Sequence, residues 1–124
     1  MILGIGVDQV EVTRIERLLE RRPEKGPLRL FTRRERATCD SRQRRAECYA
    51  ARFAAKEAFF KALGTGWRDG MGWHEIIVQN DRLGKPQIHL SGKTLEIFQG
   101  RGLESIHLSI SHEKVHAVAM VVLE

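Results

Sequence analysis

RFAAKEAFFKALGTG, residues 52–66, combines a charged pair, a run of alanines and aromatic residues, and a glycine-rich exit. Its residue types favour a helix, and Gly64 stands where a left-handed C-cap would end it. Because few polar residues lie between Phe53 and Leu63, we expect this helix to be largely buried. Small side chains leave room for another backbone or a ligand: Ala54, Ala55, Ala58 and Ala62. The sequence therefore predicts a buried central helix, from about Gln43 to Leu63, followed by a glycine-rich loop.

The charged residues of this helix allow two interpretations. Glu57 and Lys61 are four positions apart and share a face, with Arg52 and Lys56 nearby. Spacing alone favours an ordinary surface ion pair, which stabilises a helix by roughly 0.3–0.5 kcal/mol. The apolar setting favours a functional carboxylate, because a buried carboxylate requires a metal, a cation or a hydrogen-bond partner.

Length and composition indicate a small globular protein with an acidic partner. A chain of 124 residues suits one domain, over residues 1–124, with one hydrophobic core. Hydrophobic residues make up 42% and charged residues 30%, which excludes a disordered chain. The net charge of +5 and the sequence pI of about 9.7 predict that nucleic acid, anionic lipid, phosphates or an acidic protein binds.

Other features predict a cytoplasmic protein that does not enter a membrane. The apolar start MILGIGV lacks the basic region and cleavage site of a signal peptide, and no apolar run approaches membrane-spanning length. Cys39 and Cys48 fit no zinc spacing and are too few for a disulfide framework. We therefore expect both cysteines to be reduced thiols.

The chain begins with a predicted buried strand, Ile2 to Val10. Gly4 and Gly6 weaken a strand and indicate a bulge or a close backbone approach. They match the start of a dinucleotide fingerprint, but Gln9 replaces its third glycine, so we reject that motif. Asp8 is either a turn residue that ends the strand or a carboxylate placed to hold a hard cation.

A helix with one basic face is predicted next. Thr13 and Glu16 have the spacing of a capping box. The apolar stripe comprises Ile15, Leu18 and Leu19, and the opposite face carries Arg14, Arg17, Arg21 and Arg22. Since such a face is usually only solvated, the arginines by themselves identify no partner.

The following segment is also basic. Arg22 to Pro27 is predicted to be a loop because it contains prolines and a glycine. Thr32 and Glu35 form a second capping-box pattern, for a short helix that ends near Asp40. Residues 29–45 include seven arginines, as in some nucleic-acid modules, but the aromatic residues that would stack on bases total only 6% of the chain.

The second half of the chain predicts strands around one helix. The glycine-rich loop GTGWRDGMG could receive phosphate oxygens on its backbone amides, but it is not a Walker A loop. The predicted strands are Trp73–Gln79, Pro86–Leu90, Ser105–Ile110 and Val115–Leu123, and the helix runs from about Ser91 to Gln99. His107 lies on the third of these strands and His112 begins the predicted turn after it; a lone histidine at a strand end is more often structural than catalytic. The pattern is that of an α+β protein.

Three stretches resemble the signatures of the 4′-phosphopantetheinyl transferases, in family order. They are GIGVDQVEVTRI, which contains Asp8, RFAAKEAFFKALGTG, which contains Glu57, and HLSISHEKVHAVA, which contains His112. The resemblance is greatest to the short bacterial group that acts on acyl carrier proteins. It implies an α+β fold with a long central helix packed on an antiparallel sheet.

The same resemblance implies a reaction. The family transfers 4′-phosphopantetheine from coenzyme A to a serine of an apo acyl carrier protein and releases adenosine 3′,5′-bisphosphate. Asp8 and Glu57 would hold Mg²⁺, and Lys61 would meet the pyrophosphate, so these three residues would be catalytic. Glu57 would take the serine proton, either directly or through a metal-bound water, and the sequence does not separate these routes.

Binding residues follow from the resemblance as well. Arg52, Lys61 and His112 would contact coenzyme phosphates, and the nucleotide would be lined by Gly64, Thr65, Gly66, Gly84, Lys85 and Pro86. The acidic carrier would dock on Arg14, Leu18, Arg21 and Arg22. Short members form homotrimers with sites between subunits, so a homotrimer is expected here. The resemblance implies coenzyme A and a carrier protein as partners, and no nucleic acid or membrane. Trp67 and Glu113 depart from the family pattern.

Two other classes of function remain open on the sequence alone. A non-catalytic basic module for nucleic acid would explain the charge but not Asp8, Glu57 and the glycine loop. A different magnesium phosphotransferase or nucleotide-binding protein on the same scaffold would bind coenzyme A without transferring from it.

Overall fold

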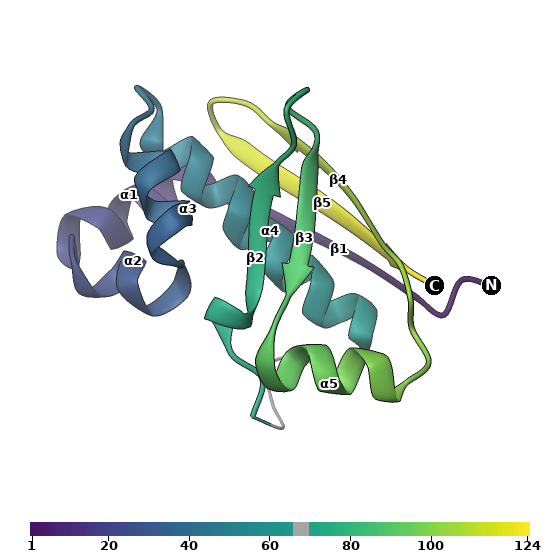
Figure 1. Cartoon of the computed structure of the whole chain (residues 1–124). Helices are drawn as coiled ribbons and strands as arrows, with labels where there is room; N and C mark the ends of the chain where they lie inside the picture. The colour runs from purple at the N-terminus through teal and green to yellow at the C-terminus, as the bar shows by residue number, and fades with distance from the viewer. Residues whose placement is uncertain (66–69) are drawn as a thin grey trace.

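The computed structural model describes residues 1–65 and 70–124, arranged as helices around a long central helix and two antiparallel sheets (Figure 1). The strands are β1 (Gly4–Glu11), β2 (Ile76–Asn80), β3 (Pro86–Leu90), β4 (Ile106–His112) and β5 (His116–Leu123). The helices are α1 (Val12–Arg21), α2 (Lys25–Leu30), α3 (Arg33–Asp40), α4 (Arg45–Leu63), the 3-10 turn η1 (Trp73–Glu75) and α5 (Gly92–Gly100). The α+β class and the central helix are as predicted.

The central helix α4 is buried along most of its length, as its apolar sequence predicts. It ends at Gly64, whose φ of 83° is left-handed and whose N–H donates to the carbonyl groups of Phe60 and Lys61. In the part of the chain that the structure describes, no helix is long and apolar enough to cross a membrane.

Strand β1 lies unusually close to α4. A Cβ atom added at Gly4 would meet the carbonyl oxygen of Ala62, and one added at Gly6 would meet that of Ala58. The glycines of the strand and the alanines of the helix therefore allow the two backbones to touch. This close packing confirms the predicted backbone approach and fixes Asp8 beside the helix.

The sheet β1–β5–β4 has one covered face and one exposed apolar face. The alternation in β1 turns Gly6, Asp8 and Val10 toward α4 and leaves the intervening side chains exposed. β5 pairs antiparallel with both neighbours, with Val7 opposite Met120. The exposed apolar side chains of the outer face include Ile5, Val7, Val118 and Met120.

A second, two-stranded sheet is formed by β2 and β3. It is tied to α3 and α4 through the buried pair of Glu35 and Lys56, whose Oε1 and Nζ atoms lie 2.7 Å apart. Lys56 Nζ also donates to the carbonyl groups of Leu30 and Trp73, and Glu35 Oε2 accepts from the N–H of Val78. These bonds fix β2 beside the helices.

Local predictions before α4 are partly wrong. Thr32 and Glu35 form the predicted capping box of α3, whereas Thr13 lies inside α1, which begins at Val12 without a side-chain cap. The loop predicted for Arg22 to Pro27 gives way to helix α2, because Pro27 stands in the first turn, where a helix tolerates proline.

The prediction of reduced thiols is also wrong. The structure joins Cys39 of α3 to Cys48 of α4 in a disulfide. Packing of the two helices brings their Cα atoms within 5.4 Å of each other, a separation that a disulfide can bridge. The spacing of nine residues in the sequence does not reveal this contact.

Candidate active site

The predicted catalytic residues meet where β1 crosses α4. Lys61 Nζ donates to Asp8 Oδ1 at 2.9 Å and to the carbonyl oxygen of Val7 at 3.1 Å. The Asp8 side chain is only 15% exposed, whereas that of Lys61 is 55% exposed. The carboxylate is therefore held in place by the strand and the lysine, and the ammonium group stays accessible to a ligand.

Glu57 lies one turn before Lys61 and is half-buried. Burial and the nearby negative charge of Asp8 raise the pKa of Glu57, while Lys61 and Arg14 oppose that shift. Glu57 is therefore a partly buried carboxylate close to a second carboxylate. A further cation would relieve their repulsion.

The donor set fits a hard cation such as Mg²⁺. Asp8 and Glu57 offer only oxygen atoms, which Mg²⁺ prefers. Within residues 1–65 and 70–124, no group of three or more His, Cys, Asp or Glu side chains is placed to hold a metal. A metal held by these two carboxylates would complete its coordination with water and ligand oxygens, which suits Mg²⁺ and a phosphorylated substrate.

A basic groove of about 930 Å³ opens at Glu57. Its walls come from α1 and α2, and its floor includes Phe53 and Trp73, whose rings stack at 5.6 Å between centroids. The guanidinium group of Arg14 lies over the Phe53 ring. All four residues predicted to bind a carrier line this groove, namely Arg14, Leu18, Arg21 and Arg22, together with Arg17, Lys25 and Arg29.

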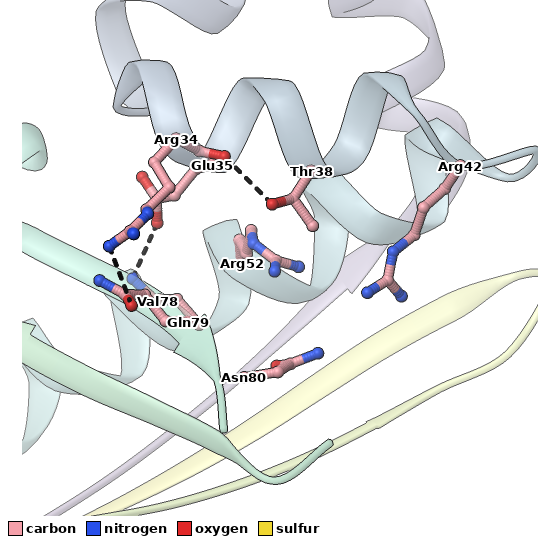
Figure 2. A pocket seen from close by; sticks show the side chains of 8 residues that line it. All are labelled: Arg34, Glu35, Thr38, Arg42, Arg52, Val78, Gln79 and Asn80. Carbon is pink, nitrogen blue, oxygen red and sulfur yellow. Dashed lines mark hydrogen bonds between the residues drawn. The ribbon is translucent and has the colours of Figure 1, made fainter. Parts of the chain in front are cut away.

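A separate cavity of about 260 Å³ lies between α3, α4 and β2 (Figure 2). Arg34, Arg42 and Arg52 line it, with Asn80 at the end of β2. Figure 2 shows the guanidinium groups of Arg42 and Arg52 turned into the same space. Glu35 also lines the cavity, but its carboxylate is paired with Lys56, so the three arginines favour an anionic group there.

Arg52 is the buried member of that cavity. It is 6% exposed, its Nη1 donates to Cys48 Sγ, and burial lowers its pKa. Its Nε is the one buried side-chain polar atom among the described residues that has no hydrogen-bond partner. A buried guanidinium that is incompletely paired is suited to receive an anion.

The remaining predicted residues do not gather in one place within the chain. His112 does not line the cavity of Arg52; it bonds to Glu47 of α4 at 2.6 Å. Gly64 and Thr65 follow α4, while Gly84 and Lys85 lie in the β2–β3 turn and Pro86 begins β3; this turn lies away from the end of α4 in Figure 1. Gly66 and Trp67 are outside the described residues.

Sequence reasoning missed several residues of these surfaces. Arg34, Arg42 and Asn80 are far from Arg52 in sequence and approach it only through packing of α3 and β2 on α4. Phe53 and Trp73 also stack on each other although they are distant in the sequence. The seven arginines between residues 29 and 45 were the available signal, and two of them, Arg34 and Arg42, line the cavity.

Comparison with known proteins shows that the chain is similar to one protein family. The model of the 4′-phosphopantetheinyl transferase superfamily matches residues 4–120. The holo-[acyl-carrier-protein] synthase of Trichlorobacter lovleyi is 55% identical over 124 residues, which are 100% of this chain and 98% of that protein. The protein of the same name from Geobacter metallireducens is 49% identical, with the same coverage.

Solved structures that resemble this chain come from the same family. The crystal structure of holo-[acyl-carrier-protein] synthase from Neisseria meningitidis has a TM-score of 0.93 and 35% identity, and the match covers 100% of this chain and 99% of that one. The Bacillus anthracis synthase in complex with CoA (3′,5′-ADP) has a TM-score of 0.82 and 42% identity, covering 99% and 96%.

Proposed function

Because the chain belongs to the 4′-phosphopantetheinyl transferase superfamily, we propose that it is a holo-[acyl-carrier-protein] synthase. It transfers 4′-phosphopantetheine from coenzyme A to a serine of an apo acyl carrier protein, with Mg²⁺, and releases adenosine 3′,5′-bisphosphate. The observation that carries this proposal is the meeting of Asp8, Glu57 and Lys61 at the mouth of a basic groove. The expected location is the cytoplasm.

The groove supports an acidic protein as the acceptor. Cations from α1 and α2 surround it, while Leu18 and Phe53 provide apolar contact. Charges around the rim steer an acidic carrier and mainly raise its association rate. Since Glu57 is part of the groove lining, a carrier docked there would present its serine next to the carboxylates.

The chemistry is phosphoryl transfer at a pyrophosphate, so the residues must orient the reactants and balance charge. Asp8 and Glu57 would hold Mg²⁺, which when bound neutralises negative charge on the pyrophosphate. Lys61, fixed by Asp8 but exposed, adds a positive charge to the phosphate being transferred. Glu57 would take the serine proton, either directly or through a metal-bound water.

Coenzyme phosphates account for the second cationic surface. The cavity around Arg52 fits a phosphate group, and Arg42 and Asn80 would join it. The cavity and the groove are separate, because Arg52 lines one and Glu57 the other, and one extended coenzyme would reach both across the surface of an assembly. Gly64–Gly66 and Gly84–Pro86 would line the nucleotide in the same way, from two subunits.

An oligomer also follows from the outer face of the sheet. Ile5, Val7 and Met120 are each about half exposed on β1 and β5, and the alternation there is apolar on both faces. An apolar patch of this kind on a small domain indicates an interface. We propose that three copies pack through this face, as in the short members of the family, with sites between subunits.

The test is a transfer assay. Purified protein is incubated with an apo acyl carrier protein, coenzyme A and Mg²⁺, and the intact carrier is weighed by mass spectrometry. Gain of one phosphopantetheine on the carrier serine is expected. A folded protein that binds coenzyme A but leaves several carriers unmodified would contradict the proposed function, and salt-sensitive binding of RNA would then favour a nucleic-acid module.

A further inference from the structure

The disulfide closes the corner between α3 and α4. Cys39 lies in the last turn of α3 and Cys48 in the first turn of α4, and they are the only cysteines of the chain. Both side chains are buried. A thiol therefore reaches the bond only when this corner opens locally, and a change at the bond acts on the residues packed around it.

The segment that the disulfide encloses carries one cation of the smaller cavity. Arg42 stands between the two cysteines, and its guanidinium group turns into the same space as that of Arg52 (Figure 2). Burial lowers the pKa of Arg52 most, Glu35 opposes that shift, and the nearby charge of Arg42 adds to it. The two cations therefore repel each other, and a covalent bond across the corner holds Arg42 in place against that repulsion.

Cys48 also contacts the buried cation of the cavity directly. Its Sγ accepts a hydrogen bond from Nη1 of Arg52 at 3.1 Å. In a disulfide this sulfur carries no net charge, which leaves the charge of the guanidinium to a ligand. After reduction, a thiolate of Cys48 would pair with Arg52 and compete with an anion, because a neighbouring guanidinium favours the thiolate form.

Other contacts keep α3 on α4 when the disulfide is reduced. The buried pair of Glu35 and Lys56 fixes the N-terminal half of α3. At its C-terminal end, Asp40 accepts a hydrogen bond from the Tyr49 hydroxyl at 2.8 Å. Reduction is therefore expected to loosen the segment between the two helices without unfolding the domain.

We propose that Cys39 and Cys48 form a reversible redox modification site that controls anion binding in the cavity between α3, α4 and β2. The oxidised form holds the arginines ready for the anion, and the reduced form binds it more weakly. The inference rests on the proposed function for the identity of the anion, a phosphate of the coenzyme or of its nucleotide product. In the cytoplasm, the expected location, disulfides are usually transient and redox-sensing.

A dithiol reductant supplies the electrons for this modification. Its thiolate attacks Sγ of Cys39, the disulfide bond breaks, and Cys48 leaves as the thiolate that Arg52 stabilises. The second thiol of the reductant then displaces Cys39 from the mixed disulfide. The protein gains two electrons and the reductant becomes a disulfide, while its two protons pass to the cysteines or, where Cys48 stays ionised, to water. A disulfide oxidant reverses the exchange.

The test compares the oxidised and the reduced wild-type protein. Adenosine 3′,5′-bisphosphate is the probe because, unlike coenzyme A, it has no thiol that would exchange with the disulfide. Calorimetry should give a dissociation constant about tenfold higher after reduction with dithiothreitol, the effect of misplacing one charge-assisted hydrogen bond. Replacing dithiothreitol with oxidised glutathione should restore the original value. Equal dissociation constants for the two forms would overturn the proposal.

A double variant controls for effects of the reductant elsewhere. Cys39→Ala combined with Cys48→Ala leaves no sulfur to oxidise and no buried hydroxyl without a partner. Its dissociation constant for the bisphosphate should be the same with and without dithiothreitol. A tenfold response in the double variant would overturn the proposal, since the chain has no other cysteine.

Counting thiols tests the modification independently of any ligand. Alkylation in denaturant followed by mass spectrometry should find no free cysteine after treatment with oxidised glutathione and two after dithiothreitol. Two free cysteines in both samples would overturn the proposal. If neither form transfers phosphopantetheine to a carrier, the proposed function fails; normal transfer with equal dissociation constants for the two forms rejects only the redox control.

Discussion

Lys56 shows how a single residue beside the candidate site serves the fold instead of the chemistry. Burial lowers its pKa, and Glu35 opposes that shift. With no exposed surface, its Nζ bonds to Glu35, Leu30 and Trp73 and so joins α2, α3 and η1 to α4. Its neighbour Glu57 points instead to the basic groove. Adjacent positions on one helix therefore divide stability and function between them.

Replacing Lys56 tests this structural role. Lys56→Met should lower the free energy of unfolding by about 3–5 kcal/mol, because it leaves the carboxylate of Glu35 buried without its cation. Adding Glu35→Gln should recover part of the loss by removing that charge. Urea unfolding at neutral pH measures both changes. A loss below about 1 kcal/mol for Lys56→Met would show that the pair is dispensable.

At the scale of an element, α5 is capped by a residue outside its own sequence. Glu75 of η1 accepts from the N–H groups of Lys93 and Thr94, at 3.0 Å each, and from the Thr94 hydroxyl at 2.7 Å. Burial alone would raise the pKa of Glu75, but these hydrogen bonds lower it overall. The helix dipole also stabilises the negative charge of Glu75 at the start of α5.

The lowered pKa of Glu75 gives a pH-dependent contribution to stability. It is complete above the ordinary value of 4.5 and is lost as pH falls through the lower value of the folded protein. Glu75→Gln should therefore cost about 1–2 kcal/mol at neutral pH. The difference in melting temperature between variant and wild type should shrink in acid. A difference that is constant with pH would mean that the charge is irrelevant.

Some helices and strands could be predicted from the sequence, whereas contacts between distant segments could not. α4, β3 and the capping box of α3 were found because apolar patterning and local turn chemistry specify them. Thr13 misled because its spacing to Glu16 imitates a cap, although the strand β1 runs directly into α1. The disulfide and the bond between Glu47 and His112 escaped because long-range packing creates both.

In the candidate site, too, some residues could be predicted from local sequence and others depend on long-range packing. Asp8, Glu57 and Lys61 could be named from motifs, and the structure brings Asp8 and Lys61 into direct contact. The remaining lining of the cavity around Arg52 could not be predicted, because α3 and β2 supply it from distant parts of the chain. Local patterns specify which side chains are present, and only packing determines which of them meet.

At the scale of the whole molecule, the apolar outer face of β1 and β5 predicts assembly. Val7→Asp places a charge on that face and should convert the assembly to a folded monomer with little transfer activity. Light scattering after size exclusion measures the mass, and circular dichroism checks the fold. Leu83→Asp is the matched control, since Leu83 is 96% exposed but lies in the β2–β3 turn away from the sheet. A wild type that is already monomeric would contradict the proposed trimer.

The most direct measurement of the central claim is metal-dependent transfer by the wild type and by Glu57→Gln. Apo carrier, coenzyme A and chelator-treated protein are mixed with increasing Mg²⁺, and the mass of the carrier is followed over time. Transfer should require Mg²⁺ in the wild type and fall at least about 100-fold in folded Glu57→Gln, while Glu96→Gln, an exposed control on α5, keeps full activity. Full activity of Glu57→Gln, or transfer unaffected by the chelator, would contradict the assignment of Asp8 and Glu57 as the catalytic centre.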